Sequence, residues 1–227
     1  MPLSVTREDV RRLRARGALV VEVLPRDDYE RRHIAGAINL PLAELSEETA
    51  ARLDRRRPIV TYGYDFQCDL SARAAARLES MDFANVYNYE GGKLDWVASG
   101  LPTEGSAADE PTIGDVAHRD APTCRLDERL ADLTKRMSEG WNWCAVINQD
   151  LVVLGRVRRR TIEEHPHASV RQAMENGPAT YRPGMPASQM VELMTEGGYD
   201  SAFVTDPDGR FIGLVNRLDL ETARQRT

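Results

Sequence analysis

A single thiol stands between two secondary-structure signals, an apolar run at residues 59–62 and an alanine-rich segment that begins at Ser71. The run predicts a buried strand, and the segment predicts a helix with Asp69 or Ser71 as its N-cap. Cys68 lies in the loop between them. A strand–loop–helix turn aims backbone N–H groups at an anion, and the positive end of the helix favours the nucleophilic thiolate. A reactive thiol and a cysteine that only fills space both fit these residues.

The elements that must position this thiol alternate along the first hundred residues. The sequence predicts strands at 18–24, 59–62 and 86–89, with helices after Thr6, at 42–53 and from Ser71. Such alternation predicts an α/β fold with a mainly parallel sheet. Functional sites in such parallel sheets lie beyond the carboxyl ends of the strands. The loop from Gly63 to Asp69 follows the carboxyl end of the predicted strand at 59–62.

Composition limits the classes of partner. The net charge is −6 in 227 residues, which gives no electrostatic reason to expect nucleic acid or an anionic membrane. No apolar run approaches the ~20 residues of a transmembrane helix, and the first ten residues lack the core of a signal peptide. Cys68, Cys124 and Cys144 fit neither a disulfide framework nor a zinc pattern, so we assign no metal ligands and expect a reducing cytoplasm.

Three runs of residues point to a known family. They are Tyr29-Glu-Arg-Arg-His-Ile-Ala-Gly-Ala-Ile-Asn-Leu-Pro41, the cysteine-bearing loop with Ser71-Ala-Arg-Ala-Ala75 after it, and Gly91-Gly-Lys-Leu-Asp-Trp96. Together they resemble the rhodanese family over residues 1–105. Active members of that family are α/β domains that carry sulfane sulfur as a persulfide on a loop cysteine. They pass it from a donor such as thiosulfate to a thiophilic acceptor, so the resemblance implies Cys68 as the catalytic residue.

The loop departs from the family pattern. In the family the cysteine directly follows the strand, and this position is Gly63. Aligned on Ser71, the loop is longer, and Cys68 lies late in it. Asp69 opposes a thiolate by like charge and Arg73 offsets it. The other loop candidates are Tyr64, Asp65, Phe66 and Gln67.

Three interpretations of this loop's function remain open. Cys68 serves as the nucleophile from a shifted position, or the domain is a catalytically silent scaffold. A weaker third reading is an enzyme for arsenate or phosphate esters, which the longer loop permits. His33 is interpreted as bracing a turn through hydrogen bonds rather than as a catalytic residue.

The second half of the chain nearly repeats itself after a turn-forming linker at 101–111. Each copy, at 111–165 and 166–227, predicts strand, helix, strand, strand and helix. The pair resembles tandem cystathionine-β-synthase (CBS) domains, which often bind adenosine-containing ligands in the clefts between copies. Such pairs commonly associate, so the resemblance implies a homodimer. The predicted fold class is therefore α/β, with an N-terminal rhodanese-like parallel sheet and flanking helices and a C-terminal tandem CBS pair.

A nucleotide site in CBS pairs is marked by Gly-x-Val-Thr-x-x-Asp. The second copy reads Gly213-Leu-Val-Asn-Arg-Leu-Asp219 and keeps the aspartate, whereas the first copy ends in Thr161 and has lost it. We expect one site for an AMP- or ATP-like ligand, built from Thr180, Tyr181, Tyr199, Asn216 and Asp219, with Arg158 or Arg217 on phosphate. A decayed pair that only packs or dimerises, with Asp219 as a helix cap, fits equally well. Trp141 and Trp143 are interpreted as core or interface anchors.

The sequence thus predicts a sulfur carrier or sulfurtransferase coupled to a pair that senses an adenosine-containing ligand. No cofactor is required, and the partners are a small-molecule sulfur donor or a thiol acceptor. The alternative is a silent scaffold with a regulatory or dimerising CBS module.

Overall fold

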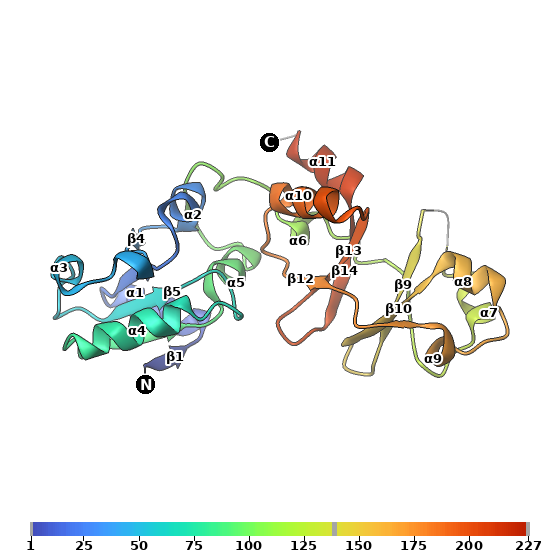
Figure 1. Ribbon diagram of the computed structural model, residues 1–227, viewed down its shortest axis with the longest axis horizontal. Coiled ribbons are helices and arrows are strands. Elements are labelled where there is room, and N and C mark those ends of the chain that lie inside the picture. The colour runs from blue at the N-terminus through green and yellow to red at the C-terminus, as the bar shows by residue number, and fades with distance from the viewer. Residues whose placement is uncertain (1, 138–139, 226–227) are drawn as a thin grey trace. The chain divides into compact units, whose positions relative to one another are not determined.

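A computed structural model describes residues 2–137 and 140–225 and divides the chain into two compact units, Met1–Glu110 and Pro111–Thr227 (Figure 1). Each unit has its own hydrophobic cores. In this part of the chain no helix has both the length and the hydropathy of a bilayer-crossing segment.

The first unit is built on a five-stranded sheet in the order β1-β6-β5-β2-β4. Its strands are β1 Leu3–Val5, β2 Leu19–Glu22, β4 Ile38–Asn39, β5 Ile59–Tyr62 and β6 Val86–Tyr89. All four pairings are parallel, and the register places Glu22 beside Tyr62 and Tyr62 beside Tyr89. The carboxyl ends of the strands therefore meet at one edge, and the loop after β5 leaves from the middle of it.

Helices cover both faces of this sheet. α4 (Leu70–Ser80), η1 (Leu42–Glu44) and α3 (Glu47–Ala50) pack on the face that buries Ile59. α1 (Arg7–Ala15) and α5 (Gly92–Ala98) pack on the face that buries Val60 and Tyr62. Successive strand residues point to opposite faces, so Gly63 belongs to the α4 face. The unit is completed by α2 (Arg26–Arg31) and by the two-stranded ribbon of β3 (His33–Ile34) and β7 (Thr103–Glu104).

The predicted helix over 42–53 is wrong. The chain instead forms the 3₁₀ turn η1 and the separate helix α3. Ser46 interrupts the helix because its backbone is extended and its side chain accepts a hydrogen bond from the Thr49 N–H, in a capping box that starts α3. The break leaves Pro41, Leu42 and Ala43 at the end of the sheet, where they line a groove described below.

The second unit repeats one arrangement twice. The first copy runs through β8 (Thr123–Cys124), α7 (Leu130–Leu133), β9 (Trp143–Ile147), β10 (Val153–Arg158) and α8 (Arg159–Glu164). The second runs through β12 (Thr180–Tyr181), α10 (Ala187–Gly197), β13 (Ser201–Thr205), β14 (Phe211–Asn216) and α11 (Arg217–Arg224). In both copies the first strand is parallel to the second and the second antiparallel to the third, so the predicted element order is confirmed. The remaining elements are α6 (Ile113–Val116), α9 (Val170–Ala173) and β11 (Glu175–Asn176).

Candidate functional site

The start of α5 holds the loop after β5 through backbone hydrogen bonds. The Lys93 N–H donates to the Gly63 carbonyl at 3.0 Å, and the Leu94 N–H donates to the Tyr64 carbonyl at 2.9 Å. Gly92 makes this approach possible, because a Cβ there would lie 2.8 Å from the backbone carbon of Tyr64 and its φ of +61° disfavours other residues. The Gly-Gly turn singled out in the sequence thus fixes the base of the loop.

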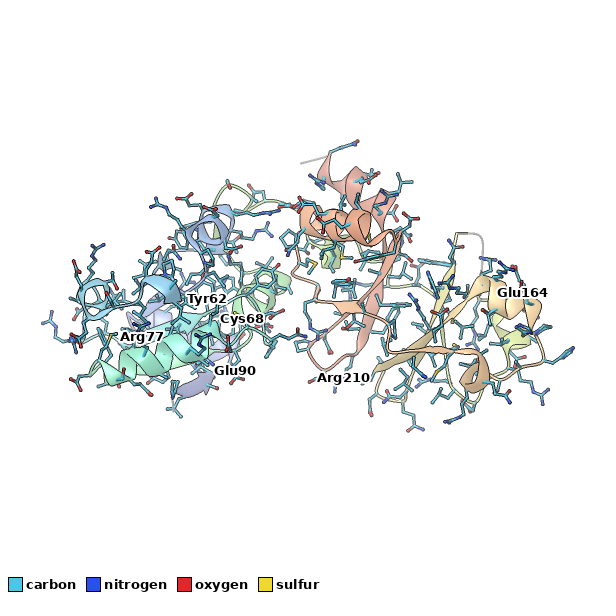
Figure 2. The ribbon with its side chains drawn as sticks, in the orientation of Figure 1. Tyr62, Cys68, Arg77, Glu90, Glu164 and Arg210 are labelled. Carbon is cyan, nitrogen blue, oxygen red and sulfur yellow. The ribbon has the colours of Figure 1, made fainter. Side chains whose placement is uncertain are left out.

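Cys68 brings its sulfur back to the end of the strand. The Cys68 N–H donates to the Asp65 carbonyl at 3.1 Å, and the Gln67 N–H donates to the Asp65 carboxylate at 3.0 Å, so the loop turns tightly at Asp65. A Cβ added to Gly63 would lie 2.7 Å from Cys68 Sγ. The sulfur therefore occupies the space of a side chain at position 63, where the family pattern has its cysteine. The thiol, labelled in Figure 2, is half-buried. Because it occupies the side-chain position of Gly63, it belongs to the α4 face.

The helix that follows begins two residues after the thiol. Asp69 occupies the N-cap position of α4, but within the described residues its side chain makes no capping hydrogen bond. It instead forms a long ion pair with Arg73, 3.7 Å between Oδ2 and Nη1. Because the Asp69 carboxylate does not cap the first turn of α4, it does not compete for the N–H groups there. Phe66, at the tip of the loop, is 51% exposed.

A buried ion pair lies at the same edge of the sheet, on the opposite face. Lys93 Nζ is 2.7 Å from Glu22 Oε1 and donates to the Asp28 carbonyl at 2.9 Å. Glu22 is fully buried, and among the described residues its Oε2 has no hydrogen-bond partner. Burial raises the pKa of Glu22 and lowers the pKa of Lys93, and each partner opposes the other's shift. The nearby Tyr62 hydroxyl accepts a hydrogen bond from the Ile34 N–H at 3.0 Å.

Sequence reasoning missed this pair. The available signal was a glutamate inside the apolar run of residues 18–24, since a carboxylate buried there requires a cation. His33, in contrast, has the expected bracing role: its Nδ1 donates to the Tyr29 carbonyl at 2.7 Å, and the two rings stack with centroids 3.7 Å apart.

A groove of about 470 Å³ opens on the α4 face, next to the loop. Its walls are mainly apolar and include Val23, Pro41, Leu42 and Leu70, with the side chains of Arg73 and Arg77 along α4.

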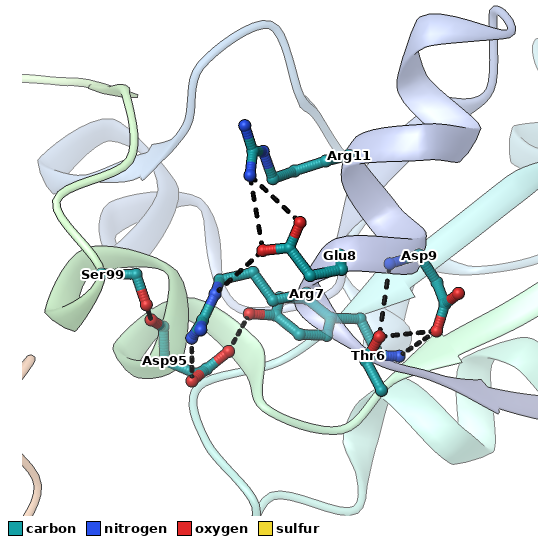
Figure 3. A network of polar contacts seen from close by, with 8 residues as sticks. Thr6, Arg7, Glu8, Asp9, Arg11, Asp95 and Ser99 are labelled. Atoms are coloured by element: carbon teal, nitrogen blue, oxygen red, sulfur yellow. Dashed lines mark hydrogen bonds and ion pairs between the residues drawn. The ribbon is translucent and has the colours of Figure 1, made fainter.

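A second cavity, of about 340 Å³, is lined by Phe66 together with residues of β1, α1 and β6. Its floor is a polar network in which Arg7 binds the Asp95 carboxylate at 2.6 Å and the Tyr89 hydroxyl donates to the same carboxylate (Figure 3). Burial and Asp95 raise the pKa of Tyr89 strongly, so its hydroxyl stays protonated and donates. Internal pairing satisfies these charges, so the network ties α1 to α5.

In the second unit a cavity of about 540 Å³ is lined by residues from both repeats. The guanidinium carbons of Arg156 and Arg158 lie 3.9 and 4.5 Å from the centroid of the Trp143 ring. Both arginines also pair with Glu175, at 2.8 and 3.1 Å. Trp143, which the sequence suggested was an anchor, thus forms part of a cavity wall that is stacked with cations.

The residues predicted for one nucleotide site fall into two places. Tyr181 and Tyr199 line this cavity and share a hydrogen bond of 2.7 Å between their hydroxyls. Among the described residues, neither Asn216 nor Asp219 lines it. Asp219 instead contacts Asn216 at 3.2 Å and His118 at 2.9 Å.

The other predicted contacts divide in the same way. Thr180 pairs with Phe203 in β12 and β13, and Arg217 pairs with Asp200 at 2.9 Å, whereas Arg158 reaches the cavity. Sequence reasoning missed Arg156 and Glu175, whose meeting depends on the pairing of β10 with β11.

The chain matches two families of known domains. The rhodanese-like domain family matches residues 6–99, and the CBS domain family matches residues 170–225. The HTH-type transcriptional regulator Rv0324 of Mycobacterium tuberculosis is 35% identical over 105 residues, which are 46% of this chain and 46% of that protein. The chain thus spans about half the length of that regulator.

Two further matches cover one unit each. Thiosulfate sulfurtransferase GlpE of Coxiella burnetii is 31% identical over 87 residues, 38% of this chain and 78% of that protein. The solved structure of CBSX2 in complex with AMP matches with 18% identity and a TM-score of 0.45, covering 51% of this chain and 97% of that one. The chain belongs to the rhodanese-like family through its first unit, and it carries a CBS domain in its second.

Proposed function

We propose that the first unit carries sulfane sulfur as a persulfide on Cys68 and passes it to a thiophilic acceptor. The observation that carries this proposal is the sulfur of Cys68 lying 2.7 Å from the Cβ position of residue 63. The longer loop compensates for Gly63 by returning a thiol to the strand end, so the displaced cysteine serves in place of the usual one.

The reaction has two steps. The Cys68 thiolate attacks the outer sulfur of thiosulfate; a bond forms between the two sulfurs, and sulfite leaves with the electron pair of the broken S–S bond. The acceptor, for example cyanide, then attacks the terminal sulfur and leaves as thiocyanate, which restores the thiolate. No cofactor or metal takes part in either step.

The role of the protein is to hold negative charge on sulfur. The thiolate and the persulfide are both anions, and α4 begins two residues beyond Cys68 with uncapped N–H groups in its first turn. Arg73 lies one turn into the helix and offsets the charge of Asp69 through their ion pair. The lysine and glycines of the 91–93 turn hold the loop so that this geometry is kept when the sulfur is loaded.

The test is thiocyanate formation from thiosulfate and cyanide by the whole chain. Cys68→Ser is expected to abolish it, whereas Arg52→Ala, an exposed arginine away from the loop, is the matched surface control and is expected to leave it unchanged. No thiocyanate from either protein would leave the silent scaffold as the function of this unit. Equal rates in the parent and in Cys68→Ser would show that Cys68 is not the thiol that carries the sulfur.

A second function rests on the cavity of the second unit. We propose that it binds an adenosine-containing ligand, with the base against Trp143 and Tyr181 and the phosphate on Arg156 and Arg158. The two guanidiniums supply the charge-assisted hydrogen bonds that phosphate requires. Glu175 now neutralises them, so the phosphate must displace its carboxylate.

Melting temperature with AMP tests this, because a ligand that binds only the native state must stabilise it. A shift that is lost in Arg158→Ala and kept in Asp219→Ala assigns the ligand to this cavity. A shift lost only in Asp219→Ala assigns it to the cluster of Asp219, Asn216 and His118, and the absence of any shift contradicts both.

A further inference from the structure

A negative charge without a cationic partner lines the cavity of about 340 Å³ at the carboxyl ends of β1 and β6. The other charges of its lining are paired. Arg7 binds Asp95 at 2.6 Å, and Glu8 binds Arg11 at 3.0 Å (Figure 3). Glu90 is exposed, and none of the residues that the structure describes places a cation on its carboxylate. The cavity therefore keeps one uncompensated negative charge.

An exposed aromatic ring lines the same cavity. Phe66 is 51% exposed, although its side chain is apolar. The ring quadrupole attracts an ammonium or guanidinium group, and a carboxylate forms charge-assisted hydrogen bonds with the same groups. The volume of the cavity lies within the range of small-molecule sites, roughly 300–1,000 Å³. These features indicate a site for a small ligand with a cationic group.

The register of the sheet places Glu90 beside the sulfur of Cys68. β5 and β6 are parallel neighbours with Tyr62 beside Tyr89, so the residues that follow, Gly63 and Glu90, are also neighbours. Neighbouring strands lie about 5 Å apart. Because the sulfur occupies the side-chain position of Gly63, Glu90 leaves the sheet about one strand spacing from it.

The Glu90 carboxylate lies on the same face of the sheet as the sulfur. It accepts a hydrogen bond from the Ser4 hydroxyl. Ser4 is paired with Asn88, and Asn88 with Thr61, so all three side chains belong to the α4 face. Gly63 belongs to that face too, and a ligand held by Glu90 is therefore on the side from which the sulfur is approached.

From these features we infer that the sulfur acceptor is a small thiol with an ammonium group, which Glu90 and Phe66 bind while the thiol reaches the persulfide on Cys68. The acceptor thiolate attacks the outer sulfur. A new S–S bond forms there as the bond to Cys68 Sγ breaks, and Cys68 leaves with the electron pair. The acceptor departs as a persulfide, and atoms and total charge balance without an oxidant. This inference rests on the proposed sulfur transfer and names the class of its acceptor.

The experiment uses the full chain and three small thiols that differ in charge, which are cysteamine, mercaptoethanol and mercaptopropionate. The Cys68 persulfide is loaded first and the excess donor is removed, so that intact mass follows the transfer step alone. Glu90→Gln and Glu90→Lys are compared with Glu48→Gln, which makes the same change of charge at an exposed residue of α3 outside the cavity. Each rate is divided by the parental rate with the same thiol, which removes the thiol's own reactivity.

Binding is measured separately in Cys68→Ser, by the change in NMR shifts on titration with cysteamine and with mercaptopropionate. We expect cysteamine to shift the signals of Glu90 and Phe66, and mercaptopropionate not to. Glu90→Gln should remove the cysteamine shifts, because the carboxylate supplies the ion pair.

The rates should divide by the charge of the thiol. In Glu90→Gln the rate with cysteamine falls about fivefold at low salt, the size that one exposed ion pair allows, and the difference shrinks as salt is added. The rate with mercaptoethanol is unchanged, and Glu90→Lys raises the rate with mercaptopropionate. Phe66→Leu lowers the rate with cysteamine about threefold, as loss of a cation–π contact predicts. Glu48→Gln changes none of the three.

Other outcomes separate the inference from the proposed function. Transfer at rates that Glu90→Gln leaves unchanged for all three thiols, or that Glu48→Gln changes equally, overturns the inference and leaves the proposed function intact. A Cys68 that takes up no sulfur, or a persulfide that passes to none of the thiols, overturns the proposed function. The assignment of the acceptor then falls with it, even where cysteamine binds.

Discussion

Substitution of Gly63 by alanine tests the position of the sulfur with a single methyl group. The added Cβ would lie 2.7 Å from Cys68 Sγ and 3.5 Å from Cys68 Cβ. Non-bonded heavy atoms prefer about 3.5–4.0 Å, so the thiol must retreat by about 1 Å. A displacement of that size at a reacting atom costs about a hundredfold in rate. We therefore expect Gly63→Ala to form the Cys68 persulfide about a hundred times more slowly than the parent.

The effect on stability is expected to be smaller. Cys68 is half-buried in a loop that can shift, so the overpacking cost should be near the low end of its range, about 1 kcal/mol. Gly63 does not have a left-handed φ, so alanine adds no backbone strain there. In a Cys68→Ala background the clash with sulfur is gone, and the same substitution should cost almost nothing.

Rates come from the time course of intact mass after addition of thiosulfate, and stabilities from urea denaturation of the four proteins in the cycle. A Gly63→Ala protein that loads sulfur at the parental rate, with the same stability in both backgrounds, would refute the placement of the sulfur at the strand end.

Lys93→Met leaves the buried Glu22 carboxylate unpaired and should lower the free energy of unfolding by about 3–5 kcal/mol. Adding Glu22→Gln should restore most of this stability. Urea denaturation that finds the double variant no more stable than Lys93→Met would contradict this. Hydrogen bonds from Thr6 lower the pKa of Asp9, so the Asp9 carboxylate stabilises the fold above its ordinary pKa and this contribution is lost as the pH falls through the lowered value. In Thr6→Ala an NMR titration should find the pKa of Asp9 closer to its ordinary value, and an unchanged pKa would show that these bonds do not set it. Glu175→Gln should strengthen AMP binding because it frees two guanidiniums, and calorimetry that finds weaker binding would show that the carboxylate contacts the ligand instead.

The sheet of the first unit could be predicted where the pattern is local. The apolar runs at 59–62 and 86–89 are bounded by turn residues and match β5 and β6. The prediction of one helix over 42–53 failed because the side chain of Ser46 competes for backbone hydrogen bonds and divides the segment. The strand β1, three residues long, is too short to give a periodic signal and depends on its pairing with β6.

The candidate sites were predicted less well because they are made by contacts between distant residues. Glu22 and Lys93 are 71 positions apart, and neither side chain suggests the other in the sequence. The path of the loop that returns Cys68 to Gly63 depends on the turn at Asp65, which lies in the part of the loop that departs from the family pattern. In the second unit, the two repeats show which positions are equivalent but not which cleft each side chain enters. The sequence therefore places Tyr181 and Asp219 in one site, whereas the structure places Tyr181 in the cavity and Asp219 beside His118.

The central claim is that Cys68 is the thiol that holds sulfane sulfur. The most direct measurement is peptide mass spectrometry. The full-length chain is exposed to thiosulfate, the excess is removed, persulfides are trapped by an alkylating reagent, and the protein is then digested. We predict the mass of one added sulfur atom on the peptide that contains Cys68, and none on the peptides of the buried Cys124 and Cys144. An unmodified Cys68, or sulfur found instead on either buried cysteine, would contradict it.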